Sequence, residues 1–374
     1  MKKILFGITG LTLGGAERVL VDIANKLCEK YDITIFTIYS GGELEKQLSE
    51  KVKLKSLYNT SYASLGKMQK KLVPLKVLLN KNGIYKKYIK DNYDVEIAFL
   101  EGPVTRLFSV KNKNTRKIAW VHNDISLVFG KGIKARVKKY FDKKIYSKYQ
   151  TIVFVSKDNM RKFKEVYKDI RNKYLEPIKK EIIYNYIDKD EVIKKAEEDI
   201  NVDYSNATLN FVTVARLVPQ KAIDRLIKVH AKLVYSNCKH NFYVIGDGPE
   251  KHNLERLIEE NNVKETFHLL GKKENPYPYI KKADYFCLLS NFEGYGMVLE
   301  EAKILGKPII ITDTAAREAV EKYENSLILE NDEDKIYEGL RSVIKTNKIN
   351  DKDFENKPYD NSKIIENLIK LIGE

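Results

Sequence analysis

Short apolar runs alternate with segments of helical periodicity along the whole chain. The runs cover residues 4–8, 33–38, 95–100, 117–121 and 152–155 in the first half, and 209–215, 242–245, 266–270, 285–289 and 308–312 in the second. Runs of this length, separated by amphipathic helical patterns, are typical of buried parallel strands joined by right-handed crossovers. The pattern therefore predicts an α/β protein with two successive sets of strands.

The N-terminal segment has two interpretations. Lys2 and Lys3 precede an apolar run, as they would in a secretory signal with a small-residue site near Ala16. However, residues 17–27 follow directly and place their apolar side chains at helical spacing. A strand, a glycine turn and an amphipathic helix explain the segment better, so we expect the first βα unit here. No uninterrupted apolar run of about 18 residues occurs, so no membrane span is predicted.

A polar stretch, residues 188–206, separates the two sets of strands. It predicts an N-terminal domain of residues 1–187 and a C-terminal domain of residues 188–357, each large enough to bury its own core. The last segment, about 358–374, has apolar residues at helical spacing. We expect it to form a helix that packs back on the N-terminal domain.

Composition indicates a globular protein in a reducing compartment. Hydrophobic residues make up 43% of the 374 residues. The three cysteines, Cys28, Cys238 and Cys287, are scattered and odd in number, so they form neither a disulfide framework nor a C-x-x-C metal pair. We therefore expect a cytoplasmic protein.

The net charge of +15 is unevenly distributed. Residues 1–187 hold 39 Lys and Arg against 18 Asp and Glu, whereas residues 188–374 hold 28 against 34. The asymmetry points to an anionic partner of the N-terminal half, either a membrane surface or a nucleic acid. A lysine-rich surface that is simply solvated is the other interpretation.

Two cations follow a predicted strand of the second half. Arg216 and Lys221 are five residues apart and come just after the run 209–215. Ligands bind at the carboxyl ends of strands in open α/β sheets, and arginine and lysine can hold phosphate oxygens. Two fixed cations could thus stabilise a diphosphate leaving group. Surface charge beside a helix is the alternative explanation.

Another predicted strand, 285–289, is followed by Glu293, a turn containing Gly294 and Gly296, and a helix that begins near Met297. Free amides at a helix start favour a phosphate. Glu301 lies about one turn inside the helix, so the two carboxylates can serve different ends of an elongated ligand. Glu301 could instead be an ordinary exposed helical glutamate.

Glycines also follow the first strand, at Gly14 and Gly15. They do not form G-x-G-x-x-G, and no acidic residue stands clearly at the end of the next strand, so a nicotinamide or flavin cofactor is disfavoured. The Asp-x-Asp-like pairs at 188–190, 332–334 and 351–353 lie in linkers or at helix starts, where capping explains them. We expect no cofactor and no essential metal.

Together these motifs resemble the retaining glycosyltransferases of family 4, which adopt the GT-B fold. The resemblance covers essentially the whole chain and depends on the order of Gly-Gly-Ala-Glu at 14–17, Ala-Arg-Leu and Lys at 215–221, Gly-Asp-Gly-Pro at 246–249, and Glu-x7-Glu at 293–301. Asn185 resembles the family's interdomain asparagine, whereas Ala215 and Ala222 stand where the family usually has glycine. The resemblance implies two Rossmann-like domains that face each other across a cleft.

The resemblance also implies roles for side chains of the second half. Arg216 and Lys221 would hold the donor diphosphate, Glu301 the ribose hydroxyls, and Glu293 the transferred sugar. Whether Glu293 acts as a nucleophile or only contacts the sugar stays open.

Further roles follow for backbone amides and for one histidine. The amides of Gly15, Met297 and Val298 would lie near the phosphates. His122, which follows the run 117–121, matches an N-domain histidine that faces the donor sugar in such enzymes. With Glu293, Arg216 and Lys221, it completes the set of candidate catalytic residues.

The expected function is transfer of a hexose or N-acetylhexosamine, with retention, from a nucleotide-diphosphate sugar to a growing, lipid-linked surface glycan such as a capsule or O-antigen. A UDP-sugar is the favoured donor. Residues 67–79 and 133–148 mix cations with apolar residues, which suits an anionic lipid surface. We expect a peripheral enzyme on the inner face of the cell membrane, with Pro74 breaking the first of these segments.

Two other functions would fit parts of the sequence. A nucleic-acid-binding protein would need aromatic stacking platforms or a recognition helix, and no such module is recognisable. A nucleotide-sugar epimerase would share the diphosphate contacts, but it should show additional acid and base groups, which five scattered histidines hardly supply.

Overall fold

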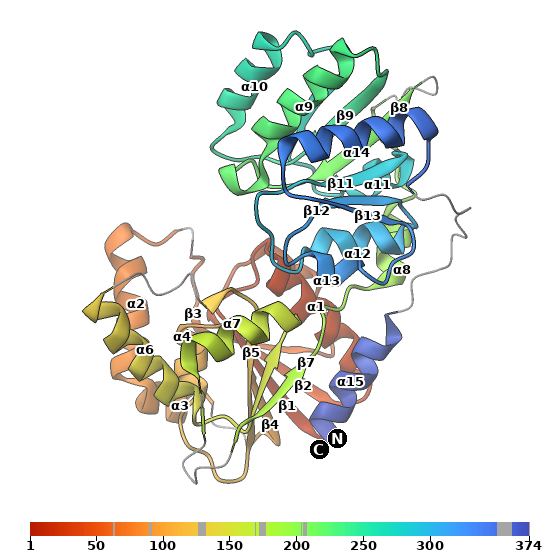
Figure 1. Ribbon diagram of the computed structural model, residues 1–374. Helices are drawn as coiled ribbons and strands as arrows, with labels where there is room; N and C mark the ends of the chain where they lie inside the picture. Colours follow the sequence, from red (N-terminus) through yellow and green to blue (C-terminus); the bar gives the residue numbers. More distant parts are fainter. Residues whose placement is uncertain are drawn as a thin grey trace. The chain divides into compact units, whose positions relative to one another are not determined.

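The computed structural model describes residues 1–62, 64–89, 92–125, 132–168, 170–171, 177–202, 204, 208–349 and 361–373. The chain divides into two compact units, Met1–Ile187 with Asn361–Glu374, and Asp188–Asp360. We call them the N-terminal unit and the C-terminal unit. Each is built around one parallel β-sheet with helices on both faces (Figure 1).

In the described residues the N-terminal sheet has seven parallel strands in the order β3-β2-β1-β4-β5-β6-β7. The strands are β1 (Lys3–Ile8), β2 (Asp32–Tyr39), β3 (Lys53–Tyr58), β4 (Val95–Ala98), β5 (Arg116–Val121), β6 (Thr151–Phe154) and β7 (Lys179–Ile182). The order reverses between β1 and β4, which is the place where open α/β sheets bind ligands.

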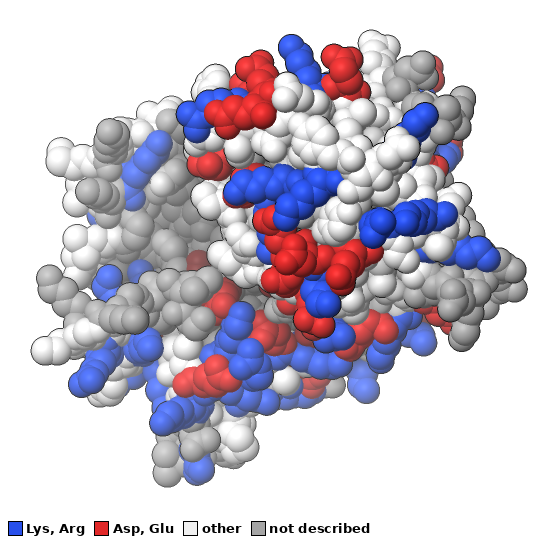
Figure 2. All heavy atoms as spheres, turned by 45° about the horizontal axis from the view of Figure 1, so that its top comes forward, with Lys and Arg blue, Asp and Glu red and all other residues white. Residues whose placement is uncertain are grey.

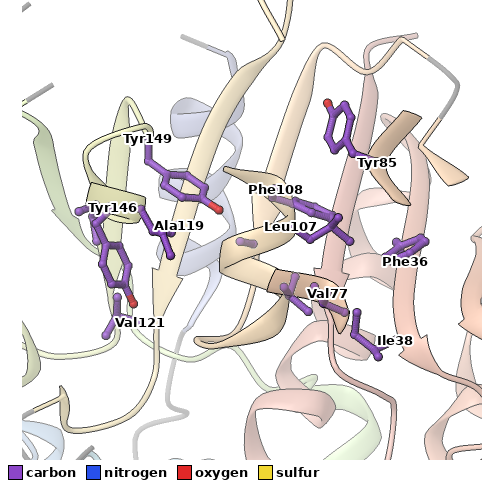
Figure 3. Packing of buried hydrophobic residues seen from close by; sticks show 14 of the residues in the cluster. Phe36, Ile38, Val77, Tyr85, Leu107, Phe108, Ala119, Val121, Tyr146 and Tyr149 are labelled. Atoms are coloured by element: carbon purple, nitrogen blue, oxygen red, sulfur yellow. The ribbon is translucent and has the colours of Figure 1, made fainter. Parts of the chain in front are cut away.

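The helices of the N-terminal unit include α1 (Gly15–Leu27), α2 (Lys67–Leu79), α3 (Lys81–Tyr88), α4 (Pro103–Phe108), α6 (Ile133–Tyr146), α7 (Lys157–Tyr167) and α15 (Ser362–Gly373), with a short 3-10 helix at Glu43–Gln47. A buried cluster joins the sheet to the helices on one face. Figure 3 shows Phe36 of β2, Val77 of α2, Phe108 of α4 and Tyr146 of α6 pointing into it.

Helix α2 continues through position 74, so the expected break at Pro74 is wrong. A proline in a helix removes one backbone hydrogen bond and crowds the preceding turn. Here Val73 and Val77, on either side of it, are both buried in the core cluster. This burial packs α2 against α4 on both sides of position 74.

Helix α15 belongs to the N-terminal unit although it lies at the end of the chain. Its apolar face is buried (Ile364, Ile365, Leu368, Leu371 and Ile372). Lys2 Nζ donates to the Ile372 carbonyl at 2.9 Å, and the Arg116 guanidinium donates to the Leu371 carbonyl. These cations satisfy carbonyls of the last turn, which have no partner within a helix.

The C-terminal sheet, in the described residues, has six parallel strands in the order β10-β9-β8-β11-β12-β13. They are β8 (Leu209–Val214), β9 (His240–Ile245), β10 (Phe267–Gly271), β11 (Tyr285–Leu288), β12 (Ile309–Thr312) and β13 (Ser326–Leu329). This 3-2-1-4-5-6 arrangement is the Rossmann order, with its reversal between β8 and β11. The helices include α8 (Lys189–Lys195), α9 (Ile223–Tyr235), α10 (Lys251–Glu260), α11 (Tyr277–Lys282), α12 (Met297–Ile304), α13 (Arg317–Val320) and α14 (Glu333–Thr346).

Three strands, β3, β7 and β13, were not among the apolar runs of the sequence. Each lies at the edge of its sheet, where it pairs on one side only. The strands are at most partly buried over most of their length. β3 and β7 carry lysines and so lack the continuous apolar character of the central strands, whereas β13 is apolar but only four residues long. Within the described residues, no helix combines the length and apolar character that crossing a membrane requires.

A buried histidine pair lies inside the C-terminal unit. His230 Nδ1 and His240 Nε2 are 2.8 Å apart, and His240 Nδ1 donates to the Cys238 carbonyl at 2.8 Å. His240 Nε2 is therefore the acceptor, and His230 Nδ1 donates to it. Burial lowers the pKa of His230 to about 2, helped by the neighbouring histidines, and lowers the pKa of His240 to about 4. Both rings stay neutral in the folded protein at mildly acidic pH.

We expect this pair to make the C-terminal unit acid-sensitive. In the unfolded chain both rings have an ordinary pKa near 6.5, so below that pH the unfolded state binds more protons and stability falls. The free energy of unfolding should drop by roughly 2–3 kcal/mol between pH 7 and 5.5. Hydrogen exchange of the β8 and β9 amides measures it. The double variant His230→Gln/His240→Gln should flatten this pH dependence, whereas His252→Gln, at an exposed histidine, should leave it unchanged. An equally steep dependence in the double variant would contradict the assignment.

Candidate functional site

The predicted cations of the C-terminal unit follow β8, at the reversal point of its sheet. Arg216 comes two residues after β8, and Lys221 ends a 3-10 helix at Pro219–Lys221. Glu293 follows β11, the strand that pairs with β8 on the other side of the reversal. The sheet topology thus brings these three residues to one edge although they are up to 77 positions apart in the sequence.

Lys221 and Glu293 form an ion pair across this edge. The side chain of Lys221 is 17% exposed and that of Glu293 is 12% exposed, so the pair is largely shielded from water. An ion pair at this depth is stronger than one on an open surface. Ser290 Oγ lies 3.4 Å from the same carboxylate oxygen of Glu293. The lysine and the carboxylate are therefore held in one place.

Hydrogen bonds fasten the two loops that carry this pair. The Asn291 amide donates to the Gln220 carbonyl at 3.0 Å, and Gln220 Nε2 donates to the Phe292 carbonyl at 3.1 Å. Asn291 Nδ2 donates to the Pro219 carbonyl at 3.2 Å. These reciprocal bonds preorganise the site, because the loops cannot separate without breaking all of them.

Two glycines allow a third loop, after β9, to approach the loop after β8. A Cβ at Gly246 would lie 1.9 Å from the Ala215 carbonyl oxygen, and one at Gly248 would lie 2.3 Å from the Leu217 carbonyl oxygen. The Leu217 amide donates to the Asp247 carbonyl at 3.0 Å. Gly246 and Gly248 are therefore required for close backbone packing, and this packing fixes the loop that contains Arg216.

Arg216 itself is exposed and takes part in no ion pair among the described residues. Ala222, which stands where the resemblance leads one to expect glycine, adopts the left-handed conformation with φ +51°. A non-glycine residue is strained there. The residue nonetheless keeps the turn in which Lys221 reaches Glu293.

Helix α12 begins at Met297, as the sequence predicts, and its N-cap Gly296 has φ +74°. The amides of Met297 and Val298 belong to the first turn, where they have no carbonyl of the same helix to bind. Such amides, with the helix dipole, favour an anion. Glu301 is half-buried on the second turn, and Tyr277 Oη lies 3.4 Å from its carboxylate.

The neighbouring Glu300 is a residue that the sequence reasoning missed. It is buried, and Tyr295 Oη donates to it at 2.6 Å while Lys303 Nζ donates to it at 2.7 Å. Lys303 Nζ also donates to the Ala319 carbonyl at 2.8 Å. This network ties the glycine-containing turn, through Tyr295, to the body of α12. A buried glutamate beside a predicted ligand glutamate gives no separate signal in the sequence.

In the N-terminal unit, the predicted residues also follow strands at the carboxyl edge of the sheet, although only β1 borders the reversal point. Gly15 is the first residue of α1, after β1, and His122 follows β5 directly. These residues and the cations of the C-terminal unit belong to different units.

His122 is enclosed and neutral. Its ring packs against Phe99 with centroids 4.7 Å apart and lies parallel to Trp120. Burial lowers the pKa of His122 to about 3, although the ring is hydrogen-bonded to the backbone of Phe99. Nε2 is buried without a hydrogen-bond partner among the described residues. A buried polar atom of this kind calls for a partner that a hydroxyl-bearing ligand can supply.

Glu101, after β4, is the second residue that sequence reasoning missed. Its carboxylate accepts from the His122 amide at 2.6 Å, the Asn123 amide at 2.7 Å and Asn123 Nδ2 at 2.9 Å. Burial raises the pKa of Glu101, while these donors oppose the shift. Glu101 holds the His122 loop in place. Its only signal in the sequence is that it follows a predicted strand.

Two of the three Asp-x-Asp-like pairs are helix caps. Asp188 accepts from the Asp190 and Glu191 amides at the start of α8, and Asp332 accepts from the Asp334 and Lys335 amides at the start of α14. The third pair, at 351–353, lies outside the described residues. The described residues contain no group of three or more His, Cys, Asp or Glu side chains suited to a metal ion.

Residues 197–360 match the protein-family model described as "Glycosyl transferases group 1". Two similar proteins come from Campylobacter jejuni. An N-acetylgalactosamine-N,N'-diacetylbacillosaminyl-diphospho-undecaprenol 4-alpha-N-acetylgalactosaminyltransferase is 27% identical over 100% of both chains. A GalNAc-alpha-(1->4)-GalNAc-alpha-(1->3)-diNAcBac-PP-undecaprenol alpha-1,4-N-acetyl-D-galactosaminyltransferase is 26% identical over 81% of this chain and 77% of its own.

Among solved structures, the chain is similar to Anabaena HepE in complex with UDP and glucose. The TM-score is 0.72 at 18% sequence identity, and the match covers 100% of both chains. The predicted fold, with two Rossmann-like domains of the GT-B type, is confirmed. The confirmed fold, the match of residues 197–360 to the family model and the similarity to the Campylobacter transferases identify the protein as a glycosyltransferase with the GT-B fold.

Proposed function

We propose that this GT-B glycosyltransferase belongs to the retaining family 4 and transfers a hexose or N-acetylhexosamine from a UDP-sugar to a lipid-linked glycan, without a metal. The observation that carries the proposal is the fixed Lys221–Glu293 pair at the reversal point of the C-terminal sheet, beside the start of α12. A cation, a carboxylate and helix amides at this edge suit the parts of a nucleotide sugar.

The diphosphate is assigned to Arg216, Lys221 and the first amides of α12. Arg216 is exposed and takes part in no described ion pair, so its guanidinium is available to phosphate oxygens. Lys221 is already shielded and fixed by Glu293, so its charge needs little reorganisation when the diphosphate binds. Such preorganised charges stabilise the negative charge that builds on the leaving group, which lowers the barrier mainly through electrostatics and positioning.

The transferred sugar is assigned to Glu293 and His122, and the ribose to Glu301. Glu293 can accept hydrogen bonds from sugar hydroxyls while it stays paired with Lys221. His122 is neutral at physiological pH, and its Nε2 has no described partner, which suits a hydroxyl group. Glu301 is half-buried one turn inside α12, where two hydroxyls of a ribose can meet its carboxylate. The backbone of Gly15 completes the set of proposed contacts.

The acceptor is proposed to be a lipid-linked glycan of the cell surface. Both Campylobacter relatives are named for transfer to undecaprenol-linked acceptors, and the first of them matches this chain from end to end. The strongly basic N-terminal half favours an anionic membrane surface over nucleic acid as its partner. We place the enzyme in the cytoplasm, peripherally on the inner face of the cell membrane.

Nucleotide binding with and without a chelator tests both the identity of the donor nucleotide and whether its binding requires a metal. UDP at 100 times its Kd should stabilise the protein by about 2.7 kcal/mol, and GDP and ADP at the same concentration by less. EDTA should leave this stabilisation unchanged, because protein cations neutralise the diphosphate. Thermal unfolding of the protein with each nucleotide, with and without EDTA, measures both effects.

Two results would contradict the proposal. If EDTA abolished the stabilisation by UDP, a metal would be needed to bind the diphosphate. If none of the three nucleotides stabilised the protein, the proposed donor site would be wrong. Incubation with UDP-N-acetylhexosamine alone should give at most slow hydrolysis. A change in the configuration of the sugar would instead indicate an epimerase.

A further inference from the structure

Helix α2 exposes a row of large apolar side chains. Met68 is 75% exposed and Leu79 is 78% exposed, and Leu72 and Leu75 between them are also exposed. Their spacing places them along one face of the helix. The opposite face carries Val77, which is fully buried beside α4 (Figure 3). Other residues of α2 therefore pack into the core of the N-terminal unit, and the row of apolar side chains on its outer face stays exposed to solvent.

Helix α6 repeats the arrangement. Ile133 is 78% exposed, and Val137, Tyr140 and Phe141 are also exposed, at spacings of four, three and one residues along one face. The inward face carries Tyr146, which lies in the same core cluster as Val77 (Figure 3). Eight exposed large apolar residues on two helices are more than scattered surface positions explain, and they mark an interaction surface.

Both helices belong to one side of the N-terminal unit. Each packs on α4, and the three helices lie against the same face of the sheet (Figure 1). We call the outer faces of α2 and α6 the docking surface. It is defined by Met68, Leu72, Leu75, Leu79, Ile133, Val137, Tyr140 and Phe141.

The charges around the docking surface have one sign. The sequence of α2 contains four lysines and no acidic residue, and that of α6 contains six Lys or Arg and one Asp. Asp142 accepts a hydrogen bond from Tyr167 of α7, so it is engaged toward the interior. Lys144 Nζ lies 4.3 Å from the centre of the Tyr140 ring. Figure 2 shows many Lys and Arg side chains, with Asp and Glu between them, on the face of the molecule in view.

We propose that the docking surface enters the interfacial region of an anionic lipid bilayer, with its apolar side chains among the acyl chains and its cations at the headgroups. Apolar residues on one helical face, interleaved with lysines, are the pattern of helices that lie in a membrane interface. Cations near the surface add attraction to anionic lipids, and a tyrosine with an adjacent lysine suits the headgroup level.

The inference rests on the proposed function, because the docking surface would bring the enzyme to the membrane that carries its acceptor. A lipid-linked acceptor presents its glycan at the membrane. Binding of the N-terminal unit there would confine the enzyme to the plane of its acceptor. Vesicle binding without donor or acceptor tests the docking surface alone, so its failure and the failure of the proposed reaction can be told apart.

The experiment compares binding of the full chain to vesicles of phosphatidylglycerol and phosphatidylcholine by co-sedimentation. The wild type should bind phosphatidylglycerol vesicles, more weakly in high salt, and should bind pure phosphatidylcholine vesicles poorly. The variant Leu79→Ser/Ile133→Ser should bind phosphatidylglycerol vesicles at least about tenfold more weakly, because two apolar insertions are lost. Both residues are highly exposed, so the fold should persist, which the melting temperature checks.

The matched control is Ile193→Ser/Tyr235→Ser, which removes two exposed apolar residues from the C-terminal unit and should leave vesicle binding unchanged. Equal binding by the variant and the wild type would overturn the proposal. So would a wild-type dimer that dissociates on the Leu79→Ser/Ile133→Ser change without any vesicle binding, because the docking surface would then be covered by a second copy of the chain.

Discussion

Replacing Arg216 by alanine should reduce turnover by about 10²–10³-fold, with the fold and melting temperature retained. Arg216 is exposed and takes part in no described ion pair, so the folded protein loses little when the side chain is removed. In the reaction, by contrast, a guanidinium that meets the diphosphate stabilises charge that develops only as the bond to the sugar breaks. The effect should therefore fall mainly on kcat. Steady-state kinetics with a UDP-sugar and a lipid-linked acceptor measures it.

The matched control is Arg256→Ala, which removes an exposed arginine of the same unit from α10. It should leave turnover within about twofold of the wild type, since a surface ion pair contributes little. Arg216→Lys should recover part of the loss, because a lysine restores the charge but not the two-pronged contact. If Arg216→Ala turns over like the control, the diphosphate is bound elsewhere.

Replacing Lys117 by methionine should destabilise the N-terminal unit by about 3–5 kcal/mol. Lys117 Nζ donates to Glu96 Oε2 at 2.6 Å and to the Phe108 carbonyl at 2.8 Å, and the side chains of Lys117 and Glu96 are 4% and 0% exposed. Tyr85 also donates to Glu96. Without the lysine, the carboxylate is left as an uncompensated buried charge. Urea unfolding followed by tryptophan fluorescence measures the unfolding of the N-terminal unit alone, because the single tryptophan is Trp120 on β5.

The double variant Lys117→Met/Glu96→Leu separates the pair from simple loss of packing. It should recover much of the stability, because a buried ion pair replaced by apolar groups of similar volume costs little. Lys113→Met, at an exposed lysine three residues before Arg116, should be nearly neutral. A double variant as unstable as the single one would show that the lysine acts through its own contacts and not through Glu96.

The central strands of both sheets could be predicted because each is buried on both faces and reads as a continuous apolar run. Three edge strands, β3, β7 and β13, were not predicted. β3 and β7 carry lysines among partly exposed positions, and β13 is only four residues long with its last residue alone buried. The continuation of α2 through Pro74 depends on the burial of Val73 and Val77, a contact with a distant part of the chain. Local propensity alone therefore gave the wrong interpretation there.

Some residues of the candidate site could likewise be predicted from the sequence, and others could not. Arg216, Lys221 and Glu293 were recognisable because each follows a predicted strand, and the carboxyl ends of parallel strands share one edge. The roles of Glu101 and Glu300 were not recognisable. Their partners, the His122 loop and Tyr295 with Lys303, can be identified only once neighbouring loops and helices are placed.

By itself the sequence determined ten of the strands, the two-domain α/β fold and the positions of Arg216, Lys221 and Glu293 after predicted strands, because periodicity and glycine turns act locally. Only the tertiary structure decided that Lys221 pairs with Glu293, that His122 is a neutral ring whose Nε2 is buried, and that α2 and α6 leave apolar faces uncovered. The physical reason is that pairing and burial depend on residues far apart in the chain, whose distances are set only when the sheets assemble.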